Sequence, residues 1–451
     1  MSVDGVERQG RQVTGVNMET PSTELRISIN TPRPDRSDAE TSAVRCRFCA
    51  ATLIHTFVDL GMSPLCQTHI EPHQLNHMEP FYPLHVWVCH ECFLVQLEQY
   101  VAPAGIFNEA YGYFSSYSDS WVEHARRYTD LMIRRFGLNS RSCVMEIASN
   151  DGYLLQHFRA AGVPCLGIEP AANVAAAARA KGIPTLEVFF GEKTASAIAA
   201  EHGSPDLLLG NNVLAHVPDI NDFVKGMKRL LNPTGVITME FPHLLQLIEQ
   251  NQFDTIYHEH FSYLSFATVE RIFRHHGLVI FDVEELPTHG GSLRIYARHL
   301  EDRTKPASDA VRRLREYEAS EGLERLETYA AFDERVKETK RRLLEFLIGA
   351  KRDGKKIVGY GAPGKGNTLL NYCGIRRDFL DFTVDRSPHK QGRYTPGTHI
   401  PILSPEEIAR ARPDYVLILP WNLKEEIMLQ MAHIRQWGGR FVVPIPTTAV
   451  L

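Results

Sequence analysis

The sequence predicts an α/β protein built on doubly wound parallel sheets, with a small metal-binding domain at the N-terminal side. Short apolar strands alternate with helical segments in two stretches, 143–299 and 356–445, as they do in parallel sheets with crossover helices. Two Cys-x-x-Cys pairs precede both stretches. A chain of 451 residues is too long for one hydrophobic core, so we expect about three domains.

Changes in composition divide the chain. Residues 1–40 are polar and rich in Arg, Asp and Pro, and we expect a disordered tail there. The cysteine pairs define a zinc-binding domain over 41–105. The first α/β domain covers 106–304, and 305–451 holds a charged helical linker followed by a second α/β domain.

The overall composition is that of a soluble globular protein, with 43% hydrophobic and 23% charged residues. A net charge of −5 gives no general attraction to nucleic acid. No apolar run approaches the roughly 20 residues of a membrane span, and no signal-peptide pattern opens the chain. We therefore expect a cytoplasmic protein without nucleic-acid or membrane partners. The sequence does not indicate an oligomeric state.

The cysteine pairs carry the spacing of two zinc knuckles. Together they supply four thiolates, which close a tetrahedral site and hold structure rather than catalyse. The ligands would be Cys46, Cys49, Cys89 and Cys92. The gap between the pairs exceeds the usual ribbon gap of roughly 15–20 residues, and we expect an inserted loop broken by Pro64, Pro72, Pro80 and Pro83. Reduced cysteines without metal, or two disulfides, are the alternatives.

The remaining cysteines are scattered in apolar surroundings and are typical of small core residues. They are Cys66, Cys143, Cys165 and Cys373. For Cys66 the alternative is a loop thiol near the knuckles.

The elements of the first α/β domain follow in order. An aromatic and hydroxyl-rich segment, 111–118, leads into an amphipathic helix over 119–136. Strands at 143–147, 164–168, 206–209 and 236–240 alternate with helices, including an Ala-rich one at 171–181. The late strands 278–285 and 292–299 are joined by only a few residues, so we expect them to pair antiparallel.

The turn after the first strand, Glu146 to Gly152, lies at the carboxyl edge, where such sheets bind ligands. Glu169 ends the next strand and is placed to accept hydrogen bonds from a ribose. No G-x-G-x-x-G pattern stands here to cradle a pyrophosphate, which favours S-adenosylmethionine over NAD. The predicted cofactor-binding residues are Glu146, Ala148, Asn150, Asp151, Gly152, Glu169, Asn211 and Asn212.

The densest group of proton-transfer side chains is Tyr257-His-Glu-His-Phe-Ser-Tyr263. Histidine is the commonest general base, and a nearby carboxylate can orient it. His258 and His260 lack the i, i+4 spacing of a helical metal pair. The alternative is a polar surface loop. His216 follows another strand and is either functional or a packed loop histidine.

The second α/β domain contains Gly359-Tyr-Gly-Ala-Pro-Gly364 after a strand, with Asp385 at a later strand end. Read alone, this indicates dinucleotide binding. The other interpretations are a loop whose amides, with Lys365 and Asn367, approach a diphosphate, and a tight turn that needs glycine for packing. Trp421 flanks the same cleft or, more simply, packs in the core.

In combination these motifs resemble the sugar C-methyltransferase family, which acts on nucleotide-linked ketosugars. The matching features are the four cysteines, Tyr111, the Glu146–Gly152 turn, Asn211-Asn212 with His216, Tyr257–His260 and His289-Gly-Gly-Ser292, and the resemblance runs from about residue 44 to the C-terminus. It implies a zinc-binding domain, a class I methyltransferase sheet and a C-terminal Rossmann-like domain. S-adenosylmethionine and structural zinc would be the cofactors. Ala148-Ser149 departs from the glycine that many methyltransferases carry in this turn.

The resemblance also implies roles for single residues. His260 would be the base, with Tyr257, Glu259, His216 and Tyr111 around the reacting carbon. Substrate would contact Tyr113, Ser116, His289, Lys365 and Asn367. The expected reaction is methylation of a carbon beside a ketone through an enolate. Tyr257 as the base, an O-methyltransferase, and an NAD-dependent sugar oxidoreductase are the alternatives. A zinc-ribbon adaptor lacks the expected basic patch.

Overall fold

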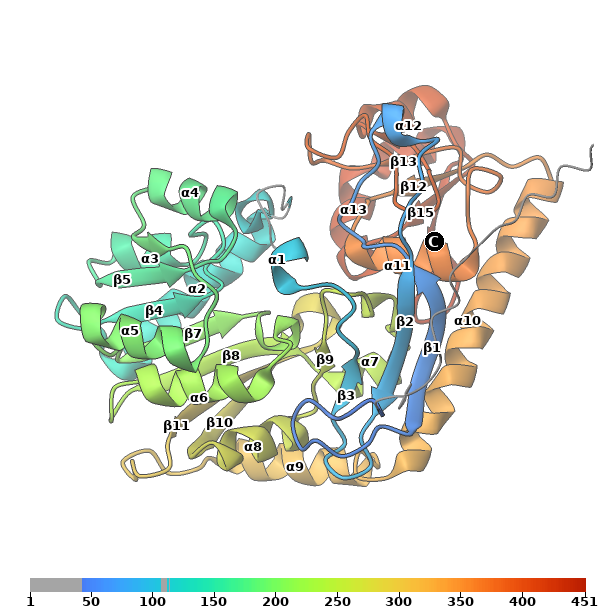
Figure 1. Cartoon of the computed structure of the whole chain (residues 1–451). Coiled ribbons are helices and arrows are strands. Elements are labelled where there is room, and N and C mark those ends of the chain that lie inside the picture. The colour runs from blue at the N-terminus through green and yellow to red at the C-terminus, as the bar shows by residue number, and fades with distance from the viewer. Residues whose placement is uncertain (1–42, 107–111, 113) are drawn as a thin grey trace, which may run out of the picture. The chain divides into compact units, whose positions relative to one another are not determined.

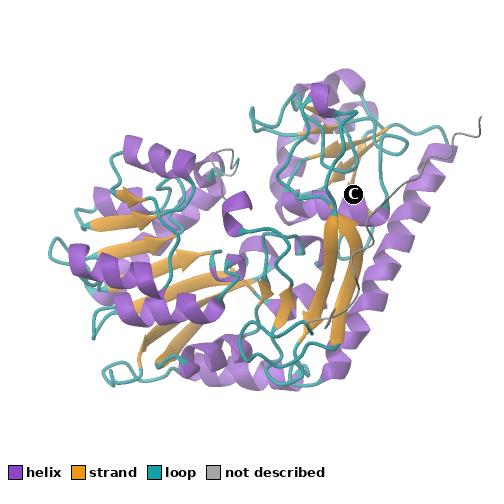
Figure 2. Ribbon diagram, viewed as in Figure 1, coloured by secondary structure: helices purple, strands orange, loops and turns teal. Residues whose placement is uncertain are grey.

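The computed structural model describes residues 43–106, 112 and 114–451. The predicted tail, together with Tyr111 and Tyr113, lies outside the described residues. Ala43–Leu451 form one unit that contains three sheets (Figures 1 and 2). No helix in the described part of the chain is long and apolar enough to cross a membrane.

The first sheet is antiparallel and has the order β1-β2-β3-β9. Its first three strands are β1 (His55–Ser63), which follows the first cysteine pair, and β2 (Tyr82–Val88) and β3 (Val95–Leu97), which flank the second pair. The fourth, β9 (Ser262–Tyr263), comes from far along the chain, directly after the histidine segment. Two strands, 55–63 and 82–88, therefore occupy part of the gap between the knuckles, so the expected inserted loop is correct only for 64–81. Pro83 lies within β2.

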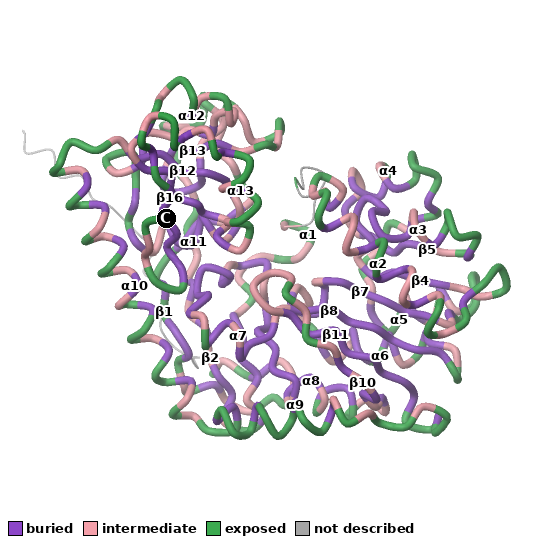
Figure 3. The backbone as a smooth tube through the Cα atoms, turned by 180° about the vertical axis from the view of Figure 1, so that it is seen from behind, coloured by how far each residue is buried: buried purple, intermediate pink, exposed green. Residues whose placement is uncertain are grey.

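The central sheet has the order β10-β11-β8-β7-β4-β5-β6. Only β11 runs antiparallel to its neighbours, and the predicted antiparallel pair of late strands is confirmed. Because the parallel strands are covered on both faces, they are almost wholly apolar and buried (Figure 3). The strands are β4 (Val144–Ile147), β5 (Cys165–Ile168), β6 (Thr185–Leu186), β7 (Leu207–Asn211), β8 (Val236–Pro242), β10 (Leu278–Leu286) and β11 (Ser292–His299).

Capping residues set the bounds of the helices on this sheet. Helix α2 (Asp119–Phe136) begins where the Ser118 side chain accepts a hydrogen bond from the Trp121 amide, and ends at Gly137 in the left-handed conformation. The helix predicted over 119–136 is confirmed. Other helices of this half are α1 (Pro103–Ile106), α3 (Leu155–Ala160), α4 (Ala172–Ala180), α5 (Glu192–His202), α6 (Ile220–Leu230), α7 (Leu244–Glu249) and α8 (Phe266–His275).

The third sheet has the order β14-β13-β12-β15-β16-β17 and is parallel except at β17. Its strands are β12 (Ile357–Tyr360), β13 (Thr383–Val384), β14 (Ile402–Leu403), β15 (Tyr415–Ile418), β16 (Arg440–Val443) and β17 (Ala449–Val450), and its helices are α11 (Gly364–Cys373), α12 (Glu406–Ala411) and α13 (Lys424–Gln430). The second parallel α/β region that the sequence predicts is therefore present.

The charged segment between the two α/β regions forms α9 (Asp309–Ser320) and α10 (Leu326–Arg352). Helix α10 runs along β1 of the first sheet (Figure 1). Its apolar positions recur every three or four residues and face inward. Phe332 stacks on Phe57 of β1 at 4.5 Å between ring centroids. The segment is thus a packed cover for the first sheet as well as a linker.

Candidate functional site

The four paired cysteines form one compact cluster. Their sulfurs all lie within 4.8 Å of one another, with Cys46–Cys92 and Cys49–Cys89 at 3.5 Å and Cys49–Cys92 at 3.6 Å. Sulfurs bound to zinc at about 2.3 Å stand about 3.8 Å apart at the corners of a tetrahedron, whereas a disulfide is about 2 Å long. The cluster fits zinc, and four sulfurs leave no coordination position for substrate.

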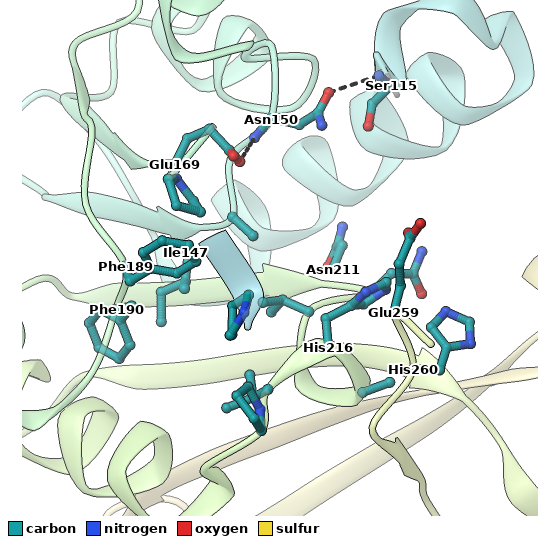
Figure 4. Close-up of a pocket in the computed structure, with 18 of the residues that line it drawn as sticks. Ser115, Ile147, Asn150, Glu169, Phe189, Phe190, Asn211, His216, Glu259 and His260 are labelled. Carbon is teal, nitrogen blue, oxygen red and sulfur yellow. Dashed lines mark hydrogen bonds between the residues drawn. The ribbon is translucent and has the colours of Figure 1, made fainter. Parts of the chain in front are cut away.

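A second feature is a cavity of about 650 Å³ at the carboxyl edge of the central sheet. Glu169, Phe189 and Phe190 lie toward one end, and His216, Glu259 and His260 lie toward the other (Figure 4). Gln67 from a loop of the first sheet, Lys365 of α11 and Lys390 from a loop of the third sheet complete the wall. One cavity therefore joins predicted cofactor residues to the predicted catalytic residues.

The cofactor end is organised around Glu169. Its carboxylate accepts hydrogen bonds from the Asn150 amide at 3.0 Å and the Ala171 amide at 2.9 Å. Burial raises the pKa of Glu169 to about 7. The Asn150 side chain in turn accepts a bond from the Ser115 amide at 2.8 Å (Figure 4). These bonds fix the turn and its acidic neighbour at the edge where a ribose would bind.

The turn after β4 adopts its conformation without a glycine at position 148. Ala148 lines the cavity with φ +55, in the left-handed region that glycine adopts more easily. Close approach is provided instead by Gly167, where a Cβ would stand 2.4 Å from the Ser149 hydroxyl. The turn is therefore built without glycine at Ala148, at a conformational cost.

Polar groups that follow β7 also face the cavity. Asn211 is buried, and neither atom of its side-chain amide has a partner among the described residues. The Asn212 amide lies 3.3 Å from His289 Nε2. A buried amide without a partner is costly unless a ligand satisfies it, so Asn211 fits a polar cofactor.

Three predicted cofactor residues do not line the cavity. Glu146 is fully buried within β4, where burial and the neighbouring Glu169 raise its pKa well above the usual range. Asp151 pairs with Lys181 at 2.9 Å. Gly152 packs close to Ile183. These three residues therefore stabilise the turn and do not face the cavity.

Two wall residues, Phe189 and Phe190, were not predicted from the sequence. They line the cofactor end of the cavity, and Phe189 remains 45% exposed despite its size. Consecutive aromatic residues just before the glycine that precedes α5 were the available signal. Their flat apolar surface suits an adenine ring.

At the other end, His260 has a defined tautomer. Its Nδ1 lies 2.7 Å from the Thr255 carbonyl oxygen. Because a carbonyl only accepts, Nδ1 carries the hydrogen and Nε2 keeps its lone pair. The ring centroids of Tyr257 and His216 lie 4.0 and 4.7 Å from that of His260. The structure thus brings the three predicted groups together around an imidazole nitrogen able to take a proton.

Burial keeps these imidazoles neutral. It lowers the pKa of His216 and of His289 to about 4, and that of His260 well below its usual range. Burial has the opposite effect on an acid, and raises the pKa of Glu259 to about 7. Neutral imidazole is the form required of a general base.

Cys66 lies beside Glu259 and does not belong to the four-cysteine cluster. Its thiol donates to Glu259 Oε1 at 3.4 Å, a bond that lowers the pKa of the carboxyl. His258 has a different environment from His260. Its Nε2 lies 3.1 Å from the Pro83 carbonyl oxygen, and it does not line the cavity.

The third sheet contributes cations. The Lys365 ammonium donates to the Asn422 side chain at 2.9 Å and lies 4.8 Å from the centre of the Trp421 ring. The Trp421 indole donates to Asp254 at 2.7 Å, so Trp421 packs in the core and supports Lys365. Lys390 lines the same wall and donates to the Ala362 carbonyl at 2.9 Å.

The backbone amides of the glycine loop after β12 are already hydrogen-bonded to other parts of the protein. Gly361 donates to Val384 O at 2.6 Å, Ala362 donates to Asp385 Oδ2 at 2.8 Å, and Pro363 has no N–H. This loop cannot cradle a pyrophosphate as a dinucleotide fingerprint does, which favours the tight-turn interpretation for 361–363.

Two predicted substrate residues are not on the cavity wall. Asn367 is buried within α11 and accepts from Asn371 at 3.2 Å. Ser116 accepts from Lys181 at 2.7 Å. His289 and Lys365 do line the cavity.

Comparisons with known proteins agree with this arrangement. Family models match a putative zinc-binding domain over 46–107, a methyltransferase domain over 121–283 and a C-methyltransferase C-terminal domain over 287–446. The chain is 37% identical to C-methyltransferase NovU of Streptomyces niveus over 408 residues, which cover 90% of this chain and 96% of that protein.

Solved methyltransferases match a smaller share of the chain. Magnesium protoporphyrin IX methyltransferase from Synechocystis PCC 6803, with bound SAM, is 14% identical over 39% of this chain and 78% of its own, with a TM-score of 0.30. An S-adenosylmethionine-dependent methyltransferase from Clostridium acetobutylicum is 11% identical over 39% of this chain and 92% of its own, with a TM-score of 0.32.

The four clustered cysteines lie within the segment that matches the zinc-binding family model, most of the central sheet lies within the methyltransferase match, and the 37% identical relative covers 90% of the chain. The chain belongs to the C-methyltransferase family and is an S-adenosylmethionine-dependent enzyme with a zinc-binding N-terminal domain.

Proposed function

We propose that this enzyme methylates a carbon next to the ketone of a nucleotide-linked sugar. The observation that carries the proposal is one cavity that joins a cofactor end at Glu169, a neutral histidine pair at His216 and His260, and cations from the third sheet. The resemblance to sugar C-methyltransferases supports the choice of substrate class.

The hydrogen beside a ketone is acidic because its removal gives an enolate. His260 Nε2 takes that proton, since Nδ1 is held by the Thr255 carbonyl. Tyr257 or His216 donates a hydrogen bond to the developing oxyanion, as preorganised donors do in other enzymes. Glu259 lies beside them at the cavity wall and orients a neighbour or carries the proton onward. Bound S-adenosylmethionine supplies an electrophilic methyl group for the resulting carbanion.

The substrate's nucleotide would be held at the third-sheet wall. Lys365 and Lys390 offer positive charge there, and Gly364 begins α11 at the same wall. A diphosphate matches two ammonium groups in a partly dehydrated cleft. The backbone amides of Gly361 and Ala362 take no part because they are already hydrogen-bonded within the protein.

The direct test is to incubate the enzyme with methyl-labelled S-adenosylmethionine and a panel of nucleotide-linked ketosugars, and to locate the label by NMR. We expect a methyl carbon bonded to a ring carbon beside the ketone. Transfer to a hydroxyl, or transfer only to acceptors that lack a ketone, would contradict the proposal. A Lys365→Met variant should raise KM for the nucleotide-linked substrate and leave the affinity for S-adenosylhomocysteine unchanged.

A further inference from the structure

The side chain of Arg47 joins the zinc knuckle to both histidine loops. Arg47 stands between the ligands Cys46 and Cys49. Its guanidinium donates to the Pro218 carbonyl at 2.6 Å and also to the Leu97 carbonyl. These two carbonyls belong to segments far apart in the sequence, and one side chain binds both.

One carbonyl belongs to the loop that holds His216, and the other belongs to β3, which is hydrogen-bonded to the loop that holds His260. Pro218 follows His216 by two residues. The Leu97 amide donates to the Phe261 carbonyl at 3.0 Å, and the Phe261 amide donates to the Ala215 carbonyl at 2.8 Å. The Phe261 ring, next to His260 in the chain, also lies 5.5 Å from the Arg47 guanidinium carbon. The histidine loops are thus bonded to each other and to Arg47.

The metal side of this connection is equally defined. Gln96 donates from Nε2 to the sulfur of Cys46 at 3.2 Å and accepts the Arg47 amide at 2.8 Å. The same Gln96 pairs with Ser262 where β3 meets β9. Asn221 of α6 donates to the Arg47 carbonyl at 3.1 Å. The knuckle backbone is therefore fixed from two sides, and the Arg47 side chain extends from it to the carbonyls of Pro218 and Leu97.

We propose that Arg47 is a positioning residue that fixes the His216 loop against the His260 loop, with the zinc knuckle as its rigid base. A guanidinium suits this role because its planar fork can bind two carbonyls at once. Displacing a catalytic group by about 1 Å can cost on the order of 100-fold in rate. The roles of the two histidines rest on the proposed function, whereas the contacts of Arg47 do not.

The test compares Arg47→Met, which keeps the length but not the donors, with Arg45→Met as its matched control. Arg45 lies on the same knuckle, is exposed, and bonds only locally, to the Ala50 carbonyl at 3.2 Å. Four quantities are measured on the zinc-loaded full chain: zinc content, affinity for S-adenosylhomocysteine, kcat, and hydrogen–deuterium exchange of peptides covering 213–218 and 257–263.

Arg47→Met should exchange at least about 10-fold faster in the peptides covering 213–218 and 257–263 and lose about 10- to 100-fold in kcat, with zinc content and S-adenosylhomocysteine affinity unchanged. Arg45→Met should match the wild type in all four. Arg47→Gln, which keeps one donor group, should give intermediate exchange and provides the test if Arg47→Met does not fold. Wild-type exchange in both Arg47 variants, or loss of zinc in step with loss of activity, overturns the proposal. The exchange readout needs no substrate, so it stands even if the ketosugar proposal fails.

Discussion

The cysteine cluster and the histidine cluster are both dense in reactive side chains, but they differ in what surrounds them. The four sulfurs face one another within 4.8 Å, which leaves no room for another ligand at a bound metal. The histidines line a cavity of about 650 Å³ and are kept neutral by burial. The metal site therefore suits a structural role, and in the proposed mechanism the group that takes a proton lies in the cavity.

Removing the proposed general base should cause the largest loss of activity. His260→Ala should lower kcat by about 10²–10⁴, the usual contribution of a positioned general base. Affinity for S-adenosylhomocysteine, measured by calorimetry, should persist because His260 lies away from the cofactor end. His258→Asn is the matched control, since that neighbouring histidine does not line the cavity. Equal losses in both variants would contradict the assignment.

Removing the metal should affect folding and not a catalytic step. Chelation of zinc should unfold the first sheet cooperatively, because binding energy at such a site is folding energy. Circular dichroism and thermal unfolding would measure this. Cobalt, which accepts the same tetrahedral sulfur ligands, should restore both fold and kcat to within a few-fold. A kcat that follows the Lewis acidity of the substituted metal would show that the metal takes part in chemistry.

The carboxyl in the histidine cluster gives a pH signature. With Glu259 at a pKa of about 7, kcat/KM should rise with pH through about 7, and Glu259→Gln should lack this limb. Cys66→Ala should move this limb to higher pH, since the hydrogen bond from the thiol lowers the pKa of Glu259. Cys66→Ser, which keeps a donor, should not.

Stability provides a second, independent check on the same group. The folded pKa of Glu259 exceeds the ordinary 4.5, so the folded state binds the proton more tightly than the unfolded chain. The contribution of Glu259 to the free energy of unfolding is present below about pH 4.5 and is lost as the pH rises through about 7. Relative to Glu259→Gln, the wild type should therefore lose free energy of unfolding over this window. A constant difference would show that the carboxyl is not buried.

The smallest effect concerns the cofactor turn. Ala148→Gly should raise the free energy of unfolding by about 1 kcal/mol, because it relieves the left-handed conformation at φ +55. S-adenosylhomocysteine should still bind. Gly167→Ala should lower the free energy of unfolding by about 1–3 kcal/mol, because the added Cβ would overlap Ser149. Denaturant titration would compare the two, and destabilisation by Ala148→Gly would contradict the account of the turn.

Local patterns in the sequence were sufficient for much of the fold. Spacing alone identified the four cysteines, and an amphipathic pattern identified the helix at 119–136. The pairing of the late strands followed from their short connection. Each of these features depends on residues close together in the chain, or on a ligand spacing that few other structures share.

Long-range contacts could not be predicted in the same way. Cys66 and Glu259 are 193 residues apart, and no local pattern signals that they meet. The pairing of β3 with β9 likewise depends on tertiary packing of two very short strands. Phe189 and Phe190 become a cavity wall only through the position of their loop. Glu146 was predicted at the site because strand ends usually are, but it is fully buried and does not line the cavity.

The most direct test of the central claim is exchange of the substrate's acidic hydrogen in deuterium oxide, with S-adenosylhomocysteine bound so that no methyl is transferred. The wild-type enzyme should exchange the hydrogen beside the ketone, and so should the cobalt-substituted enzyme. His260→Ala with its zinc intact should lose this exchange by about 10²-fold or more. Undiminished exchange in His260→Ala, or its loss on replacing zinc by cobalt in a fully folded enzyme, would contradict the account.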